Sequence, residues 1–287
     1  MTNGARLKEL IHAPDLLVMP GVYDPVSARV AELAGFDAVQ CTGLGIAATT
    51  LGVPDYSIVS LSEMVERTRV IANAVSIPVM ADADTGFGNA VNAFYTTEFL
   101  AKAGAAGLNI EDQVMPKRCG HLGGKELIET DEMTAKIAAC RAAVEARDFV
   151  INARTDALAV EGIDGAIERA NAYFAAGADM VYVDAVSTLK ECTVLAKELE
   201  GPLGVSMVEG GRTDPSLVFE DLQEAGVARV SLSLSLLLAA VRGMQNVLGS
   251  IKKNRGIGGN ADLVAKFDEI HEIAGMGRVL ELEKRFL

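Results

Sequence analysis

Short apolar runs alternate along this chain with longer, alanine-rich amphipathic stretches. Most runs are apolar at nearly every position, which is typical of parallel strands buried on both faces rather than of half-exposed strands. We interpret these runs as strands at Leu16–Gly21, Ala38–Gly43, Ile77–Asp84, Ala106–Asp112, Phe149–Asp156, Met180–Ala185, Pro202–Gly211 and Arg229–Ser235.

The stretches between the runs predict helices, and several of them end in glycine, a common signal for the end of a helix. Eight units of strand then helix over about 250 residues predict a (β/α)8 TIM-type barrel. A doubly wound open sheet is the alternative. No G-x-G-x-x-G motif follows the first run, so a dinucleotide-binding fold lacks support.

The chain shows no linker rich in proline, serine or charge before about residue 250. We therefore predict one domain over residues 1–287, with residues 1–250 as the barrel and residues 251–287 as a C-terminal helical tail. A TIM-type barrel does not require this last helical segment. We expect it to pack elsewhere, on another subunit.

Charge and composition limit the classes of partner that this protein is expected to bind. The 287 residues include 26 Lys and Arg against 39 Asp and Glu, a net charge of −13, so neither nucleic acid nor a membrane surface is expected to bind. The longest apolar run, Val230–Val241, is shorter than the roughly 20 residues that cross a bilayer. Four widely spaced cysteines without a C-x-x-C pair indicate a reduced, cytoplasmic protein.

Acidic residues gather where the predicted strands end, at the face on which TIM barrels carry their active sites. We expect the strand period of two to place Asp82 and Asp84 on one face, with Glu111 reaching them from the next strand. A single acid in such a place is as well explained as a helix cap or a solvated loop residue. Three converging carboxylates without a neighbouring His or Cys instead favour a hard cation such as Mg²⁺.

A basic segment, Lys117-Arg118-Cys119-Gly120-His121, follows the fourth predicted strand. A lone cysteine is usually a small buried hydrophobe. Flanking Lys, Arg and His lower the pKa of a thiol and favour its reactivity, and the glycines that follow suit a mobile lid. Composition alone leaves a reactive cysteine and a solvated basic loop as equal alternatives.

The segments TGLGIAATTLGVPD, ADADTGFGN, AGLNIEDQ, KRCGH, ARTDALAVEG and MVEGGRT resemble the isocitrate lyase/phosphoenolpyruvate mutase superfamily, in particular its methylisocitrate lyase branch. KRCGH is similar to the signature of members that cleave C–C bonds. The resemblance implies Mg²⁺, with Mn²⁺ as the alternative, held by Asp82, Asp84 and Glu111, with Asp55 near the metal waters. It also implies a homotetramer, a dimer of dimers with exchanged C-terminal helices.

The same resemblance implies the residues that act on a small carboxylic acid. The implied catalytic set is Lys117, Cys119, His121 and Arg154, with Cys119 as the general acid. Seven residues are expected to bind the substrate, either because the resemblance implies it or because they lie at strand ends. They are Thr42, Gly43, Leu44, Arg154, Asp184, Ser206 and Glu209. The first three of these correspond to the family's contact with the carboxylate of a 2-oxo acid.

The implied reaction is cleavage of 2-methylisocitrate or 2,3-dimethylmalate to pyruvate plus succinate or propionate. Leu44, Asp184 and Ser206 stand where methylisocitrate lyases or family members often have Gly, Glu and Asn. A larger residue at position 44 narrows the pocket, which makes the smaller 2,3-dimethylmalate a rival to 2-methylisocitrate. An oxaloacetate hydrolase, a phosphonopyruvate-processing enzyme and a non-catalytic metal-binding barrel are the alternatives.

Overall fold

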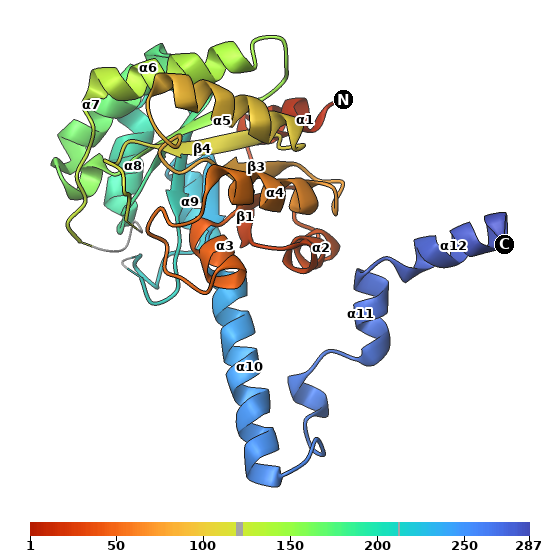
Figure 1. Ribbon diagram of the computed structural model, residues 1–287. Helices are drawn as coiled ribbons and strands as arrows, with labels where there is room; N and C mark the ends of the chain where they lie inside the picture. Colours follow the sequence, from red (N-terminus) through yellow and green to blue (C-terminus); the bar gives the residue numbers. More distant parts are fainter. Residues whose placement is uncertain (119–122, 212) are drawn as a thin grey trace. The chain divides into compact units, whose positions relative to one another are not determined.

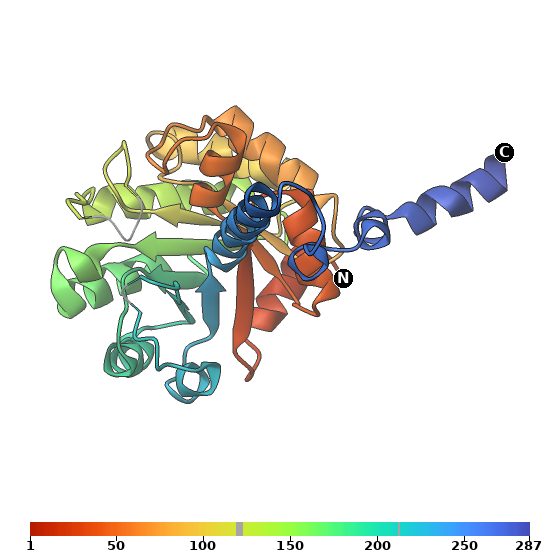
Figure 2. The ribbon, with the colours of Figure 1, turned by 90° about the horizontal axis from the view of Figure 1, so that it is seen from below.

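The computed structural model describes residues 1–118, 123–211 and 213–287. Its strands pair in parallel, each with the next along the chain, and the last returns to the first to close a barrel, which Figure 2 shows from below. The strands are β1 (Leu17–Val22), β2 (Val39–Cys41), β3 (Val79–Asp82), β4 (Gly107–Glu111), β5 (Val150–Thr155), β6 (Met180–Val183), β7 (Leu203–Ser206) and β8 (Arg229–Leu232). The predicted TIM-type barrel is confirmed, and the open sheet is excluded.

Helices connect successive strands and surround the barrel (Figures 1 and 2). They are α1 (Asn3–Ile11), α2 (Pro25–Leu33), α3 (Gly43–Thr50), α4 (Leu61–Ala72), α5 (Ala90–Lys102), α6 (Thr130–Ala143), α7 (Gly162–Ala175), α8 (Leu189–Glu198) and α9 (Phe219–Glu224), with a 3₁₀ turn η1 (Ala157–Ala159). Local sequence sets several helix starts. At α4, Ser60 Oγ accepts the amide of Glu63, and the Glu63 carboxylate accepts the amide of Ser60, so the helix begins there.

Two apolar layers support the barrel. The outward-facing strand residues, such as Leu108 and Val181, pack against the helices, for example against Leu100 of α5. At the N-terminal end of the strands, α1 places Leu7 and Ile11 in a separate apolar cluster with methionines of the barrel interior.

Between that cluster and the pocket, the barrel interior is polar, contrary to the continuous apolar character that the sequence predicted. Gln40, Asn109, Asn152 and Arg229 are inside it, and all but Asn109 are buried. This polar layer forms the floor of the pocket.

The chain divides into two units, Met1–Ser235 and Leu236–Leu287. The sequence suggested residue 250 as the boundary, but α10 (Ser235–Asn254) is one continuous helix, and nearly all of it belongs to the second unit. That unit continues through η2 (Ala261–Leu263), α11 (Phe267–Ile273) and α12 (Met276–Phe286). None of its helices has a buried residue, so exchange with a second subunit stays a prediction.

No helix in the described part of the chain has the length and apolar character required to cross a membrane.

Candidate active site

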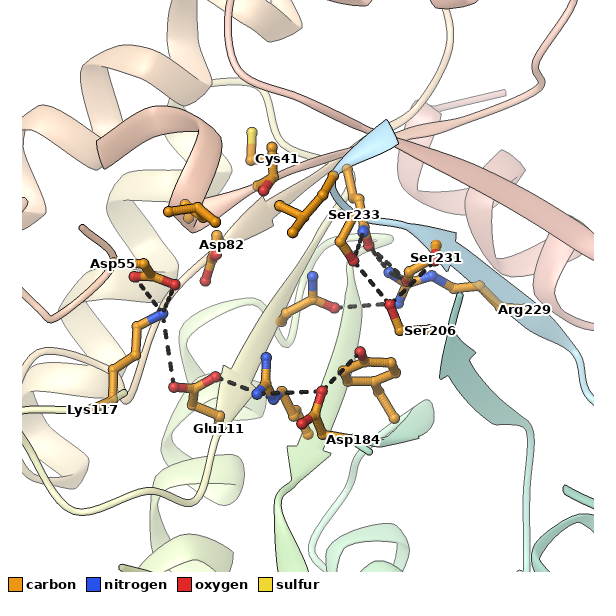
Figure 3. Close-up of a pocket in the computed structure, with 18 residues that line it drawn as sticks. Cys41, Asp55, Asp82, Glu111, Lys117, Asp184, Ser206, Arg229, Ser231 and Ser233 are labelled. Atoms are coloured by element: carbon orange, nitrogen blue, oxygen red, sulfur yellow. Dashed lines mark hydrogen bonds and ion pairs between the residues drawn. The ribbon is translucent and has the colours of Figure 1, made fainter. Parts of the chain in front are cut away.

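A pocket opens at the C-terminal ends of the strands, with a volume of about 690 Å³ including its open mouth (Figure 3). It is lined by residues from the strand ends and the loops that follow them. The predicted site residues among them are Thr42, Gly43, Leu44, Asp55, Asp82, Glu111, Lys117, Arg154, Asp184 and Ser206. The barrel therefore brings together residues that lie up to about 160 positions apart in the sequence.

Two predicted residues that the structure describes, Asp84 and Glu209, are not part of this lining. Asp84 lies behind it, in contact with Lys117. Glu209 is exposed and accepts a hydrogen bond from Ser235 Oγ (2.5 Å), because β7 ends at Ser206 and not at the predicted Gly211. Cys119 and His121 lie outside the described residues.

Asp82 and Asp84 are brought together by a turn, and not by alternation along a strand as predicted. Strand β3 ends at Asp82, so alternation along a strand does not extend to Asp84. Instead the chain turns, with Asp84 at φ 45°, and the Asp84 amide donates to Asp82 Oδ1 (3.0 Å). Aspartate is among the residues that tolerate this left-handed backbone. The turn directs the Asp84 carboxylate toward Lys117.

Lys117 lies among carboxylates from three loops and strand ends, and we call this group the Lys117 cluster. Its Nζ is 2.8 Å from Asp55 Oδ1, 2.9 Å from Asp84 Oδ1 and 4.0 Å from Glu111 Oε1. Figure 3 shows Lys117 pointing at Asp55 and Glu111. The Lys117 amide also donates to Ser57 Oγ (2.9 Å), which holds the first residue of the KRCGH segment.

The Lys117 cluster carries more negative charge than one ammonium neutralises. Burial raises the pKa of Asp84 to about 6 and that of Glu111 to about 8, and the neighbouring cations only partly oppose this effect. Asp84 Oδ1 is buried and accepts no hydrogen bond, although the ammonium of Lys117 lies beside it. The cluster thus holds three carboxylates around one ammonium, and Asp84 Oδ1 is held by the ion pair with Lys117 alone.

A second buried group, the Lys125 cluster, adjoins the first. Lys125 Nζ is 2.5 Å from Asp156 Oδ1 and 3.0 Å from Asp184 Oδ2. Arg154 also donates to Asp156, with Nε 2.9 Å from Oδ2 and Nη2 3.0 Å from Oδ1, and its Nε is 3.3 Å from Glu111 Oε2. Arg154 thereby connects the two clusters, as expected from the register that pairs Glu111 with Arg154.

Sequence reasoning missed Lys125 and Asp156. Asp156 follows Arg154 by two positions at the same strand end, and this spacing is a signal that would have paired them. Lys125 had no comparable signal, because its carboxylate partners belong to β5 and to the end of β6, about 30 and 60 residues farther along the chain. Asn109, Tyr182, Arg229, Ser231 and Ser233 also line the pocket unpredicted.

The start of α3 forms another wall of the pocket. Thr42 accepts the amides of Gly45 with Oγ1 (3.4 Å) and of Ile46 with its carbonyl (2.9 Å). Since the first amides of a helix have no acceptor within it, those of Gly43 and Leu44 suit an anion. A Cβ at Gly43 would lie 2.7 Å from Asp82 Oδ2, so a larger residue there would displace that carboxylate.

The donors in this wall and the Lys117 cluster fit a hard divalent cation. They are carboxylate oxygens, and no imidazole of the described residues lines the pocket. The thiol of Cys41 also lines it, but burial raises the pKa of that thiol to about 12, so it keeps its proton. Within the described ranges, no three acidic, His or Cys groups already converge on one point. A cation would therefore require the carboxylates to shift from Lys117.

The pocket lies at the C-terminal end of a closed parallel barrel, where TIM barrels carry their active sites. It is polar and rich in carboxylates, and it also contains a helix N-terminus and a paired arginine. These features define a site for small anionic molecules. The phosphoenolpyruvate phosphomutase family matches residues 7–252, and the chain belongs to this family, within the phosphoenolpyruvate mutase/isocitrate lyase superfamily. The resemblance found in the sequence is thereby confirmed.

Curated relatives carry lyase names. The chain is 38% identical over 289 residues to 2,3-dimethylmalate lyase of Eubacterium barkeri, covering 100% of this chain and 99% of the relative. It is 43% identical over 248 residues to 2-methylisocitrate lyase of Aeropyrum pernix, covering 86% and 79%. The solved structure of a phosphonopyruvate hydrolase with oxalate and Mg²⁺ superposes with a TM-score of 0.89 at 34% identity, covering 100% and 99%.

Proposed function

We propose that the protein is a Mg²⁺-dependent C–C lyase that cleaves a 2-methyl-branched 2-hydroxy acid to pyruvate and a second carboxylate. The observation that carries the proposal is the Lys117 cluster, whose buried Asp84 Oδ1 accepts no hydrogen bond. The cluster lies beside the open amides of α3 and within reach of Arg154. The two lyase names among the relatives support the same chemistry.

In this proposal Asp82, Asp84 and Glu111 would hold the Mg²⁺, with Asp55 beside them. The bound ion supplies Lewis-acid polarisation of the substrate's 2-oxygen, which favours a carbonyl at that carbon. The amides of Gly43 and Leu44 bind the adjacent carboxylate at the N-terminus of α3. This arrangement orients the bond between C2 and C3 toward Arg154.

Cleavage requires the 2-hydroxyl to lose its proton while the C2–C3 electron pair moves to C3. We assign proton removal to Asp55, whose carboxylate lines the pocket and is held by Lys117 Nζ. The new negative charge spreads into the carboxylate of the departing fragment. Arg154 opposes that charge from a partly buried position, in the manner of an oxyanion hole.

A proton must then return to C3 of the departing fragment. We assign this step to Cys119 as general acid, on the sequence argument alone, because residue 119 lies outside the described residues. The bonds and charges balance, since one proton leaves the hydroxyl and one reaches C3. The products are pyruvate and a saturated carboxylate.

Leu44 and Ser206 favour the smaller substrate, 2,3-dimethylmalate. Leu44 lines the pocket next to the amides that would bind the first carboxylate, so its side chain takes up space near C3. The match to 2,3-dimethylmalate lyase over 99% of that relative supports the same choice.

The direct test incubates the purified protein and Mg²⁺ with 2,3-dimethylmalate, 2-methylisocitrate, oxaloacetate and phosphonopyruvate in parallel. Pyruvate, oxalate and phosphate are each measured, because a phosphonopyruvate hydrolase also releases pyruvate. We expect pyruvate from 2,3-dimethylmalate, and none after chelation of the metal. Oxalate from oxaloacetate, phosphate from phosphonopyruvate, or metal binding without turnover of any acid would each contradict the proposal.

A further inference from the structure

Arg229, at the start of β8, is a buried cation without a carboxylate partner. Its residue is 1% exposed, and no acidic oxygen in the described part of the chain lies within 4.0 Å of it. Its Nη1 donates to Asn109 Oδ1 (3.3 Å), and its Nη2 donates to Ser231 Oγ (2.8 Å) and to Gln40 Oε1. A buried charge without a counter-ion is costly, so a stable protein that retains one requires an explanation.

The other cations that line the pocket among the described residues, Lys117 and Arg154, are both paired. Lys117 and Arg154 each contact at least two carboxylates, as does Lys125 beside the pocket. Arg229 instead keeps a buried Nε that has no hydrogen-bond partner, while its side chain lines the pocket. Burial lowers the pKa of this guanidinium to about 10, so it remains charged at neutral pH. Its Cζ lies 5.9 Å from the centroid of the Tyr182 ring, but no acidic group in the described part of the chain offsets its charge, which therefore favours an anion in the pocket.

Arg229 also determines the direction of a hydrogen-bond chain that reaches the pocket. A guanidinium only donates, so the Gln40 amide must turn its Oε1 toward Arg229. The Gln40 Nε2 then faces Ser233 and donates to its Oγ (3.3 Å). Since Ser233 Oγ accepts this bond, its own proton is free to point away from Gln40.

The next hydroxyl in the chain is that of Ser206. Its Oγ lies 3.1 Å from Ser233 Oγ and donates to the Ser231 carbonyl (3.3 Å; Figure 3). Both hydroxyls line the pocket. A carboxylate that enters it would accept the Ser233 proton directly, and would accept the Ser206 proton in exchange for the long bond to the Ser231 carbonyl. Two hydroxyl donors backed by an unpaired guanidinium are suited to such a group.

We propose that Arg229 is a positioning residue for recognition of the substrate's second carboxylate, acting through Gln40 to hold the Ser233 and Ser206 hydroxyls as donors. The anion that binds these hydroxyls supplies the charge that Arg229 lacks. The inference rests on the proposed function, which it deepens by naming the contacts of the fragment that departs. The chemical class of the ligand is a carboxylate on a short aliphatic chain.

The substitution Gln40→Glu tests this directly. It gives Arg229 a carboxylate partner inside the protein, and it replaces the Nε2 donor to Ser233 with an acceptor. Anion binding in the pocket should therefore weaken about tenfold or more, measured by calorimetric titration of succinate at saturating Mg²⁺. The Tm should stay the same or rise, because a buried unpaired charge has gained a partner.

Two substitutions of Arg229 itself complete the set. Arg229→Met should weaken succinate binding to a similar extent, and Arg229→Lys should restore part of it because the charge is kept. Mg²⁺ binding should not weaken in Arg229→Met, since removing a cation does not disfavour another cation. If Arg229→Met fails to fold, Gln40→Glu and Arg229→Lys still decide the question.

Arg141→Met is the matched control, because Arg141 on α6 is paired with Asp179 away from the pocket. It should lower the Tm and leave succinate affinity unchanged, the opposite of Gln40→Glu. With 2,3-dimethylmalate as substrate, Gln40→Glu should raise KM more than it lowers kcat.

The proposal is overturned if wild-type protein does not bind succinate, or if Gln40→Glu and every folded Arg229 variant bind it within twofold of wild type. Because the titration does not require turnover, it also separates this inference from the proposed function. Absence of pyruvate release by wild type would contradict the lyase activity while the binding results still decide the role of Arg229.

Discussion

The two buried lysines Lys117, which begins the KRCGH segment, and Lys125, which follows it, have different electrostatic surroundings. In the Lys117 cluster, carboxylates outnumber the ammonium, Asp84 Oδ1 accepts no hydrogen bond, and burial raises the pKa of Asp84 and Glu111. In the Lys125 cluster, Asp156 accepts hydrogen bonds from Lys125, from Arg154 and from Gln113. The Lys117 cluster therefore has too little positive charge for its carboxylates, whereas the charges of the Lys125 cluster are balanced.

This difference separates a reactive region from a supporting one. An excess of carboxylates over cations is a feature of a site that binds a further cation, whereas a saturated ion pair fixes the side chains around it. Arg154 belongs to both regions, because it pairs with Asp156 and also lies 3.3 Å from Glu111 Oε2. The Lys125 cluster therefore fixes the position of Arg154, which also contacts Glu111 of the Lys117 cluster.

The strongest test of this comparison is Asp84→Ala. We expect turnover to fall at least about 10³-fold, because metal polarisation contributes several kcal/mol and about 1.4 kcal/mol corresponds to tenfold. Unfolding by urea should show little loss of stability, since the cluster already has excess carboxylate. Asp131→Ala, an exposed acid on α6, is the control and should keep full activity. Mg²⁺-dependent turnover near wild type in Asp84→Ala would remove Asp84 from the metal site.

Lys125→Met should show the opposite pattern, with stability as the main loss. It leaves Asp156 and Asp184 buried without their shared ammonium, which costs about 3–5 kcal/mol in the free energy of unfolding. The exposed Lys102→Met is the control, because its ion pair with Glu98 on α5 is worth less than about 1 kcal/mol. Equal losses in the two variants, measured by urea unfolding, would mean that the Lys125 cluster does not support the barrel.

Cys119→Ser should lower turnover about 10²-fold, the usual contribution of a general acid, while substrate binding changes less. Alkylating agents should modify Cys119 before the other cysteines. Burial raises the pKa of Cys41 to about 12 and the pKa of Cys140 and Cys192 to about 11. Mass spectrometry of a partly alkylated sample checks the order. Full activity of Cys119→Ser together with an unreactive thiol would assign the proton to another group.

The smallest effect is expected from Leu44→Gly, which widens the pocket beside the Lys117 cluster. We expect it to shift the ratio of kcat/KM for 2,3-dimethylmalate over 2-methylisocitrate about tenfold toward the larger acid. Leu51→Gly, at the other end of α3 and outside the pocket lining, controls for loss of helix stability. A wild-type preference of about 100-fold for 2-methylisocitrate would show that Leu44 does not exclude it.

Local sequence determined most of the barrel. Near-continuous apolar runs located the strands to within a few residues, and glycines located several helix ends, because these features depend on neighbours in the chain. The same runs placed acids at strand ends, where the closed barrel has its pocket. Most candidate residues could therefore be named before the fold was known.

The partners of those residues were decided only by the tertiary structure. Three features depend on the register of neighbouring strands and on barrel closure. They are the turn that joins Asp82 to Asp84, the ion pairs of Lys125 with Asp156 and Asp184, and the lack of a carboxylate partner for Arg229. A sequence reports where charges occur along the chain. Whether a buried charge is balanced depends on groups that folding brings from distant positions, and this balance separates the reactive cluster from the supporting one.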